Sequence, residues 1–259
     1  MGYCAGVRKA IQAAEKADYT LGPIVHNEAV CNRFKVIGEP LSSYDVAGKT
    51  VVTQAHGTKL PLIDYLISHG ANVIDGTCAK IQASLKLIDS WPGSTVIIVG
   101  DPKHDEVRAL VSHAEQKGVR WSVISEVQPI EIGIGENALV IAQTTFDKAR
   151  YQQVRDALKG RVTTVANTIC SAMDDRLKAV DELMAKGVDG IVVVGSTTSA
   201  NTHRLLERAE MSVPATLVNG AGLLSCFLAG KNLIGLTAGA STPDEIILEV
   251  ENEIRNYRV

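Results

Sequence analysis

Residues 94–107, STVIIVGDPKHDEV, decide the fold. They contain an apolar, β-branched run of strand length, a polar loop and the start of a helix-like segment. The same order recurs along the chain in KTVVTQ (49–54), ANVID (71–75), STVIIVG (94–100), NALVIAQ (137–143), RVTTVAN (161–167), GIVVVG (190–195) and NLIGLTA (232–238). This alternation predicts an α/β fold whose mainly parallel sheets are covered by helices on both faces.

The loops after these strands resemble one another, which indicates an internal repeat. One group closes a strand with small and polar residues: TQAHGT (53–58), IAQTTF (141–146) and LTAGAST (236–242). A second group leads into a helix: VHNEAV (25–30), GDPKHDEV (100–107) and GSTTSANTHRL (195–205). The third group contains cysteine: GYCAG near Cys4, DGTCAK near Cys78 and NTICSA near Cys170.

The repeated cysteines divide the chain into three modules. They are separated by 74 and 92 residues, and we expect loops to absorb that variation. The predicted α/β modules are 6–78, 79–166 and 167–259, with residues 1–5 joining the third. No Pro/Gly/Ser linker separates them, so we expect them to pack around a shared centre where the loops beyond the strands converge.

The composition is that of a globular protein. Of the 259 residues, 46% are hydrophobic and 21% are charged. A net charge of -3 and an aromatic content of 4% argue against a nucleic-acid partner. No apolar run reaches the roughly 18 residues of a membrane span. We therefore expect no membrane partner. Five cysteines in a chain without a secretory signal predict a reducing, cytoplasmic location.

Each repeated cysteine immediately precedes a helix-like segment. Unpaired N–H groups at a helix start favour the thiolate, which is the form that binds metal or attacks as a nucleophile. One such cysteine would more often be a small buried residue, but three equivalent ones favour a metal centre. Both zinc and an iron-sulfur cluster suit three thiolates. Cys31 and Cys226 match no repeat, so we expect them to fill the core.

Polar side chains accompany the cysteine loops. Three histidines, His26, His56 and His104, lie in the repeated loops, although a single loop histidine is most often only partly exposed and structural. The surrounding donors are Asn27, Thr144, Thr145, Ser199, Asn201 and Ser241. Convergent donors and helix starts suit a phosphate, whereas the absence of a GxxxxGK[ST] sequence gives no indication of ATP.

Glu106, two residues after His104, is the candidate proton donor. A buried carboxyl group has a raised pKa and stays protonated near neutrality. Thr144 is the residue that we expect to orient or relay this proton. The alternative is an ordinary glutamate at a helix start, where the dipole favours negative charge.

Taken together, GYCAGV, VHN, AHG, GTC, H-x-E, QTT, TIC, S-x-N and TAGAS resemble the LytB family over essentially the whole chain. Members of this family are 4-hydroxy-3-methylbut-2-enyl diphosphate reductases of the non-mevalonate isoprenoid pathway. The resemblance implies a pseudo-threefold trefoil of three α/β modules around a central [4Fe-4S] cluster. It also implies that Cys4, Cys78 and Cys170 are the cluster ligands.

The resemblance further implies the reaction and its residues. An allylic diphosphate loses its hydroxyl group as water, with two electrons and two protons, giving isopentenyl and dimethylallyl diphosphates. Glu106 and Thr144 are the implied catalytic residues, and a ferredoxin or flavodoxin is the implied electron donor. The implied substrate-binding residues are His26, His56, His104, Thr144, Ser199, Ala200, Asn201 and Ser241.

The chain departs from the family pattern at four places. Ala79 replaces a proline, Met173 stands where a threonine is expected, and Ala200 replaces a frequent serine. No short strand precedes Cys4, which leaves open whether the third module lacks a strand or the numbered chain is incomplete. Met173 and Ala200 keep open a paralogue that reduces another allylic or unsaturated substrate. A non-catalytic zinc or iron-sulfur protein is the other alternative.

Overall fold

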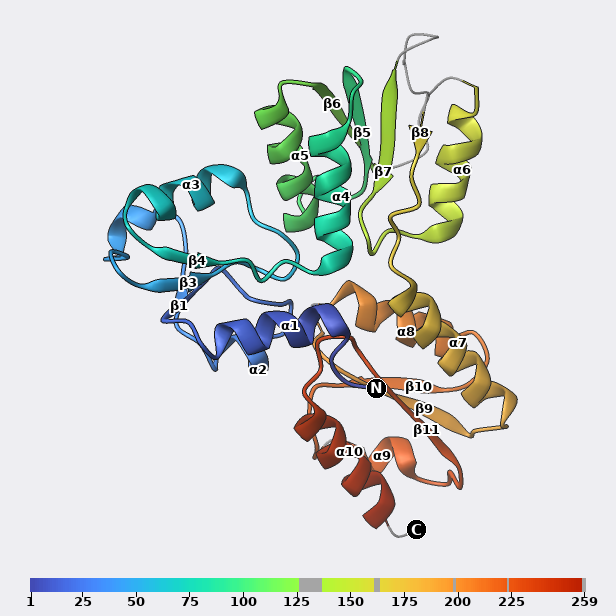
Figure 1. Ribbon diagram of the computed structural model, residues 1–259. Helices are drawn as coiled ribbons and strands as arrows, with labels where there is room; N and C mark the ends of the chain where they lie inside the picture. The colour runs from blue at the N-terminus through green and yellow to red at the C-terminus, as the bar shows by residue number, and fades with distance from the viewer. Residues whose placement is uncertain (126–136, 161–163, 198, 223, 258–259) are drawn as a thin grey trace. The chain divides into compact units, whose positions relative to one another are not determined.

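The computed structural model describes residues 1–125, 137–160, 164–197, 199–222 and 224–257 (Figure 1). These residues form two compact units. The unit that we call terminal contains Met1–Arg8, Val25–Lys35 and Ser171–Val259. The unit that we call central contains Lys9–Ile24 and Val36–Cys170. Helix α1 (Ala5–Ala14) begins in the terminal unit and ends in the central unit.

The central unit contains two four-stranded sheets, in the orders β2-β1-β3-β4 and β6-β5-β7-β8, and every pair of neighbouring strands is parallel. Its strands are β1 (Tyr19–Leu21), β2 (Val36–Ile37), β3 (Thr50–Val52), β4 (Asn72–Ile74), β5 (Thr95–Val99), β6 (Arg120–Ile124), β7 (Ala138–Ala142) and β8 (Thr164–Val165). Its helices are the 3₁₀ turn η1 (Leu41–Ser43), α3 (Leu60–Ser68), α4 (Ala79–Ser90), α5 (Asp105–Lys117) and α6 (Lys148–Leu158).

The terminal unit contains a parallel sheet of three strands among the described residues, in the order β10-β9-β11. Its strands are β9 (Gly190–Val194), β10 (Ala215–Val218) and β11 (Ile234–Ala238). Its helices are α2 (Glu28–Cys31), α7 (Ser171–Ala185), α8 (Ala200–Glu210), α9 (Ser225–Leu228) and α10 (Asp244–Asn256).

Strand β5 shows why the longest apolar runs are central strands. Ile97 and Val99 pack in a core with α6, whereas Val96 and Ile98 pack in a second core with α4 and α5. Alternate side chains of a strand point to opposite faces, so both faces of this sheet are buried under helices (Figure 1). All five residues of β5, β7 and β9 are buried for this reason.

The predicted α/β fold with three small parallel sheets is confirmed. Each of the seven predicted apolar runs contains a strand, although residues 161–163 of one run lie outside the described residues. The strands of each sheet fall within one of the ranges 6–78, 79–166 and 167–259. The module boundaries themselves, and the trefoil arrangement around a centre, stay predictions. Among the described residues, no helix has the length and apolar character that crossing a membrane requires.

The buried faces of β5 lead to a stability prediction. Ile97 has an exposed fraction of 0%, so Ile97→Ala leaves a cavity and lowers the free energy of unfolding by about 2–5 kcal/mol. Ile67 on α3 in the same unit is 59% exposed, and Ile67→Ala changes that free energy by less than about 0.5 kcal/mol. Urea unfolding followed by circular dichroism measures both. Equal losses would contradict the two-faced core.

Candidate functional site

The peptide N–H group of each repeated cysteine donates a hydrogen bond to the carbonyl group of a residue in a loop after a strand. The N–H group of Cys78 donates to the carbonyl of Ala55 at 2.8 Å, and that of Cys170 donates to the carbonyl of Thr144 at 2.8 Å. In the terminal unit the N–H group of Cys4 donates to the carbonyl of Ala240 at 3.1 Å. The acceptors lie in the loops 53–58, 141–146 and 236–242, which the sequence had matched with one another. The internal repeat therefore has a structural counterpart.

Each of these cysteines also stands at the start of a helix, as predicted. Helices α1, α4 and α7 begin at the residue after Cys4, Cys78 and Cys170 respectively. All three cysteines are half-buried, and none of them forms a disulfide. Thiol groups at helix starts, with their peptide groups already bonded, fit the requirements of thiolate ligands to a metal centre.

The segment that carries Cys170 is fixed at two further points. The Tyr151 hydroxyl group donates to the carbonyl of Ala166 at 2.6 Å. The Thr168 hydroxyl group donates to the carbonyl of Ala142 at 2.6 Å and accepts the N–H of the same residue at 2.8 Å. The segment is thus bound to the end of β7 before it reaches the cysteine.

Glu106 is a buried carboxyl group held by one residue. Its exposed fraction is 1%. The N–H group of Thr144 donates to Oε1 at 2.6 Å, and the Thr144 hydroxyl group donates to Oε2 at 2.7 Å. Burial raises the pKa of Glu106 to about 7, although both hydrogen bonds act in the opposite direction. A carboxyl group with this pKa gives up and takes back a proton near neutrality.

His56 and His104 lie close together in the central unit, with ring centroids 6.2 Å apart. The His104 side chain caps α5, because its Nδ1 accepts the N–H of Glu106 at 3.1 Å. Burial, with His56 as a second cause, lowers the pKa of His104. A ring whose Nδ1 accepts a hydrogen bond is neutral and carries its proton on Nε2.

Asp105 is a residue that sequence reasoning missed. Its Oδ2 lies 3.2 Å from His56 Nε2, and its Oδ1 lies 3.7 Å from Arg108 Nη1. Asp105 stands between His104 and Glu106 in the sequence, so its position beside the predicted site residues was the only available signal. The carboxylate lies within ion-pair distance of the His56 ring, but the contact does not have the geometry of a hydrogen bond.

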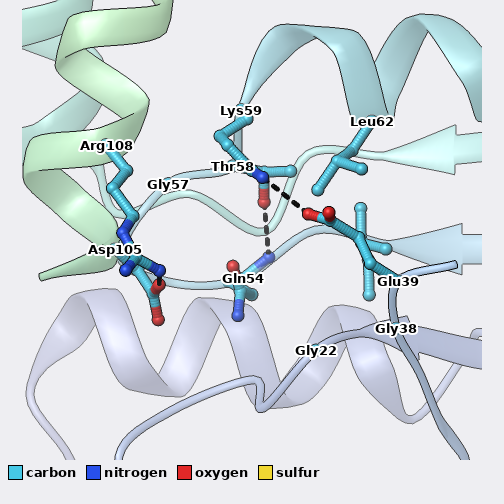
Figure 2. A pocket seen from close by; sticks show the side chains of 11 residues that line it. Gly22, Gly38, Glu39, Gln54, Gly57, Thr58, Lys59, Leu62, Asp105 and Arg108 are labelled. Atoms are coloured by element: carbon cyan, nitrogen blue, oxygen red, sulfur yellow. Dashed lines mark hydrogen bonds and ion pairs between the residues drawn. The ribbon is translucent and has the colours of Figure 1, made fainter. Parts of the chain in front are cut away.

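A cavity of about 150 Å³ borders these loops in the central unit (Figure 2). Lys59 pairs with Glu39 at 2.6 Å, and Asp105 and Arg108 also line the cavity. Two cations and two anions leave it without net charge, which does not suit a diphosphate. Among the described residues, none of the sequence-predicted site residues lines this cavity.

In the terminal unit, His26 and Ser241 lie side by side. The Ser241 hydroxyl group donates to the carbonyl of His26 at 3.4 Å, and the His26 side chain is exposed. Asn27, at 6% exposed, caps α2 by accepting the N–H of Val30. The loop with this histidine is therefore fixed by its neighbour, and the imidazole ring faces solvent.

The start of α8 carries the predicted residues Ser199, Ala200 and Asn201. The Ser199 hydroxyl oxygen accepts the N–H of Thr202 at 3.4 Å, which leaves its proton available to a ligand. Within the described chain, the buried Oδ1 of Asn201 has no hydrogen-bond partner. The side chain of Ala200 lies outside the described residues.

Two expectations about individual residues change. Met173 is 7% exposed and packs in the core of the terminal unit with Val193 and Leu205, so its thioether is a core group. Cys226 was expected to fill the core, but it is exposed on the four-residue helix α9. Cys31 is half-buried, and its thiol group donates to the carbonyl of Val25 at 3.1 Å.

Each unit thus brings together part of the predicted site. In the central unit, the N–H groups of Cys78 and Cys170 donate to the loops that contain His56 and Thr144. Thr144 in turn donates to Glu106 at the start of α5. The terminal unit contains Cys4, His26, Ser199, Asn201 and Ser241. The convergence of all these residues on one ligand stays a prediction.

Comparison with known proteins gives consistent results. The model of the LytB protein family matches residues 1–255. A 4-hydroxy-3-methylbut-2-enyl diphosphate reductase of Treponema denticola is 35% identical over 279 aligned positions, which cover 98% of this chain and 96% of that protein. A Helicobacter pylori protein of the same name is 33% identical over 265 positions, covering 98% of this chain and 96% of that protein.

Two solved structures have the same fold. The E-1-hydroxy-2-methyl-but-2-enyl-4-diphosphate reductase from Plasmodium falciparum superposes with a TM-score of 0.84 at 24% identity, covering 98% of this chain and 86% of that chain. An (E)-4-hydroxy-3-methyl-but-2-enyl diphosphate reductase, described as the terminal enzyme of the non-mevalonate pathway, gives a TM-score of 0.77 at 29% identity. That match covers 99% of this chain and 96% of that chain.

Burial of Glu106 predicts how stability varies with pH. Its pKa rises on folding from 4.5 to about 7, so between these values the folded protein binds more protons than the unfolded chain. The stabilisation by the neutral carboxyl group is therefore complete below about pH 4.5 and is lost by about pH 7, a change of about 3 kcal/mol. Glu106→Gln, which is neutral at every pH, flattens this dependence.

Urea unfolding of the metal-free protein between pH 5 and 8 measures the effect. Glu115→Gln on the exposed side of the same helix is the matched control, and its pH profile follows that of the wild type. An unchanged slope in Glu106→Gln would show that this carboxyl group ionises normally in the folded protein.

Proposed function

This chain belongs to the LytB family, and from that membership we propose that it is a 4-hydroxy-3-methylbut-2-enyl diphosphate reductase. The observation that carries the proposal is the match of the family model to residues 1–255, which leaves almost no part of the chain outside it. The three equivalent cysteines, each with its peptide N–H bonded to an equivalent loop, support the same conclusion.

The proposed reaction breaks the allylic C–O bond and forms a C–H bond. The substrate takes up two electrons and two protons, and it leaves as isopentenyl or dimethylallyl diphosphate together with one molecule of water. A [4Fe-4S] cluster bound by Cys4, Cys78 and Cys170 would supply the electrons and, at the iron without a cysteine, a Lewis acid for the hydroxyl oxygen.

The chain's own residues supply the protons and the binding groups. Glu106 carries the proton, and Thr144 fixes both carboxyl oxygens so that the group keeps one orientation. The proposed substrate-binding residues are His26, His56, His104, Thr144, Ser199, Asn201, Ser241 and the peptide N–H of Ala200, with Thr144 acting through Glu106. Preorganised hydrogen-bond donors bind a diphosphate and leave the proton path free of competing lysine ammonium groups.

The proposed partners are the allylic diphosphate and a small electron-transfer protein, a ferredoxin or flavodoxin. A paralogue with a different substrate was suggested by Met173 and Ala200. Because the Met173 side chain packs in the hydrophobic core, it gives that alternative no support.

The test of the function is purification without oxygen. We expect a brown protein with about four irons and four sulfides per chain, which converts the allylic diphosphate when reduced methyl viologen supplies electrons. A colourless protein that contains zinc, or an iron-sulfur protein without this turnover, would contradict the proposal.

The ligand assignment makes its own prediction. Cys78→Ser removes a thiolate at the start of α4, so iron, sulfide and turnover are lost. Cys226→Ser, at an exposed position on α9, retains all three and is the matched control. Iron content and the visible spectrum of the two variants measure whether each one retains the cluster. Full iron content in Cys78→Ser would exclude Cys78 as a ligand.

The proton-donor assignment is tested by kinetics. Glu106→Gln keeps the cluster spectrum but lowers turnover by about 10²–10⁴-fold, the usual contribution of a positioned general acid. In the wild type, turnover falls as the pH rises above the Glu106 pKa of about 7. Glu115→Gln behaves as the wild type. Normal turnover in Glu106→Gln would remove this carboxyl group from the mechanism.

A further inference from the structure

Arg176 on α7 binds two backbone segments of the terminal unit that are far apart in the sequence. Its Nη1 donates to the carbonyl of Ala238 at 2.5 Å, at the end of β11. Its Nη2 donates to the carbonyl of Gly2 at 2.6 Å, in the segment that leads to Cys4. One guanidinium group therefore joins the N-terminal segment to the end of β11, an edge strand of the terminal unit's sheet.

The same two segments are joined again at the cysteine itself. The N–H group of Cys4 donates to the carbonyl of Ala240, two residues after the Arg176 acceptor on β11. Gly2 has a φ of 80°, and a Cβ atom there would lie 1.9 Å from Asp244 Oδ1. The segment thus approaches α10 so closely that only glycine fits, and the bonds at Gly2 and Cys4 leave it little freedom.

The charge of Arg176 has no carboxylate partner. Within the described chain, the guanidinium group forms no ion pair with an aspartate or glutamate, and both of its hydrogen bonds go to carbonyl oxygens. Burial lowers the pKa of Arg176, and the charge of Cys4 acts in the opposite direction.

We propose that Arg176 is a positioning residue that fixes the backbone of the segment that carries Cys4. This inference rests on the proposed function, because Cys4 is taken as a cluster ligand. A backbone held at Gly2 and at Cys4 keeps the residue before α1 in one position before any metal is bound. Arg176 therefore acts on the reaction through Cys4 and touches neither substrate nor product.

Two substitutions remove the bridge. Arg176→Lys keeps the positive charge, but an ammonium group cannot reproduce the guanidinium bridge to both carbonyls. Arg176→Gln removes both the bridge and the charge. Arg208→Gln is the matched control, because it neutralises an arginine of the same unit that pairs with Asp181 on α7 at 2.7 Å.

Hydrogen exchange of the Cys4 amide in the metal-free protein tests the positioning role. Loss of a bridge made by a charged donor speeds this exchange about tenfold or more in Arg176→Lys and Arg176→Gln, with no change in Arg208→Gln. Wild-type exchange in Arg176→Lys would overturn the positioning role, and this variant carries the test if Arg176→Gln does not fold.

The outcome for this inference is separate from that for the proposed function. A wild type that holds a cluster but turns over no substrate would contradict the proposed function alone, since the Arg176 measurement is made on the metal-free protein without substrate.

Discussion

The structure depends on one hydrogen bond that occurs three times. In each repeat the peptide N–H of the cysteine donates to a carbonyl in the loop that follows a strand of its sheet. The acceptors are Ala55, Thr144 and Ala240. Because the cysteine stands one residue before a helix, the bond fixes the start of that helix to the end of a strand. The three cysteines are thereby related to three sheets by the same local geometry.

Thr144 forms hydrogen bonds both to a proposed cluster ligand, Cys170, and to the proposed proton donor, Glu106. Its carbonyl accepts the N–H of Cys170, while its own N–H and hydroxyl groups both donate to Glu106. The position of a proposed ligand and that of the proposed proton donor are thus set by one residue. A displacement of this loop would change both, which explains why the Cys170 segment is also held by Tyr151 and Thr168.

The sequence predicted the parts of the fold that depend on continuous burial. Strands such as β5 and β9 are buried along their whole length and give unbroken apolar runs. Strands β1 and β2 escaped notice because they have three and two residues, and β6 because three of its five residues are exposed. Strands β2 and β6 are also edge strands, which have one free side, so their composition does not distinguish them from loops.

The candidate site shows a similar division. Residues that recur in matched loops, such as Cys78 and His56, could be found by comparing the chain with itself. Arg176 could not, because it belongs to no matched loop and its contacts are with backbone atoms distant in sequence. Asp105 lies in the matched loop 100–107, but its proximity to His56, which is 49 residues away in the sequence, is visible only in the structure. The prediction that Cys226 fills the core was wrong. The apolar stretch around it was equated with burial, but Cys226 is exposed on the short helix α9.

The hydrogen bonds of the three cysteines to the loops are made entirely by main-chain atoms, so they form before any metal is bound. Much of the conformational entropy of the ligand loops has therefore been given up during folding itself. Insertion of a cofactor then requires little ordering of the chain, and its binding free energy is not spent on shaping the loops.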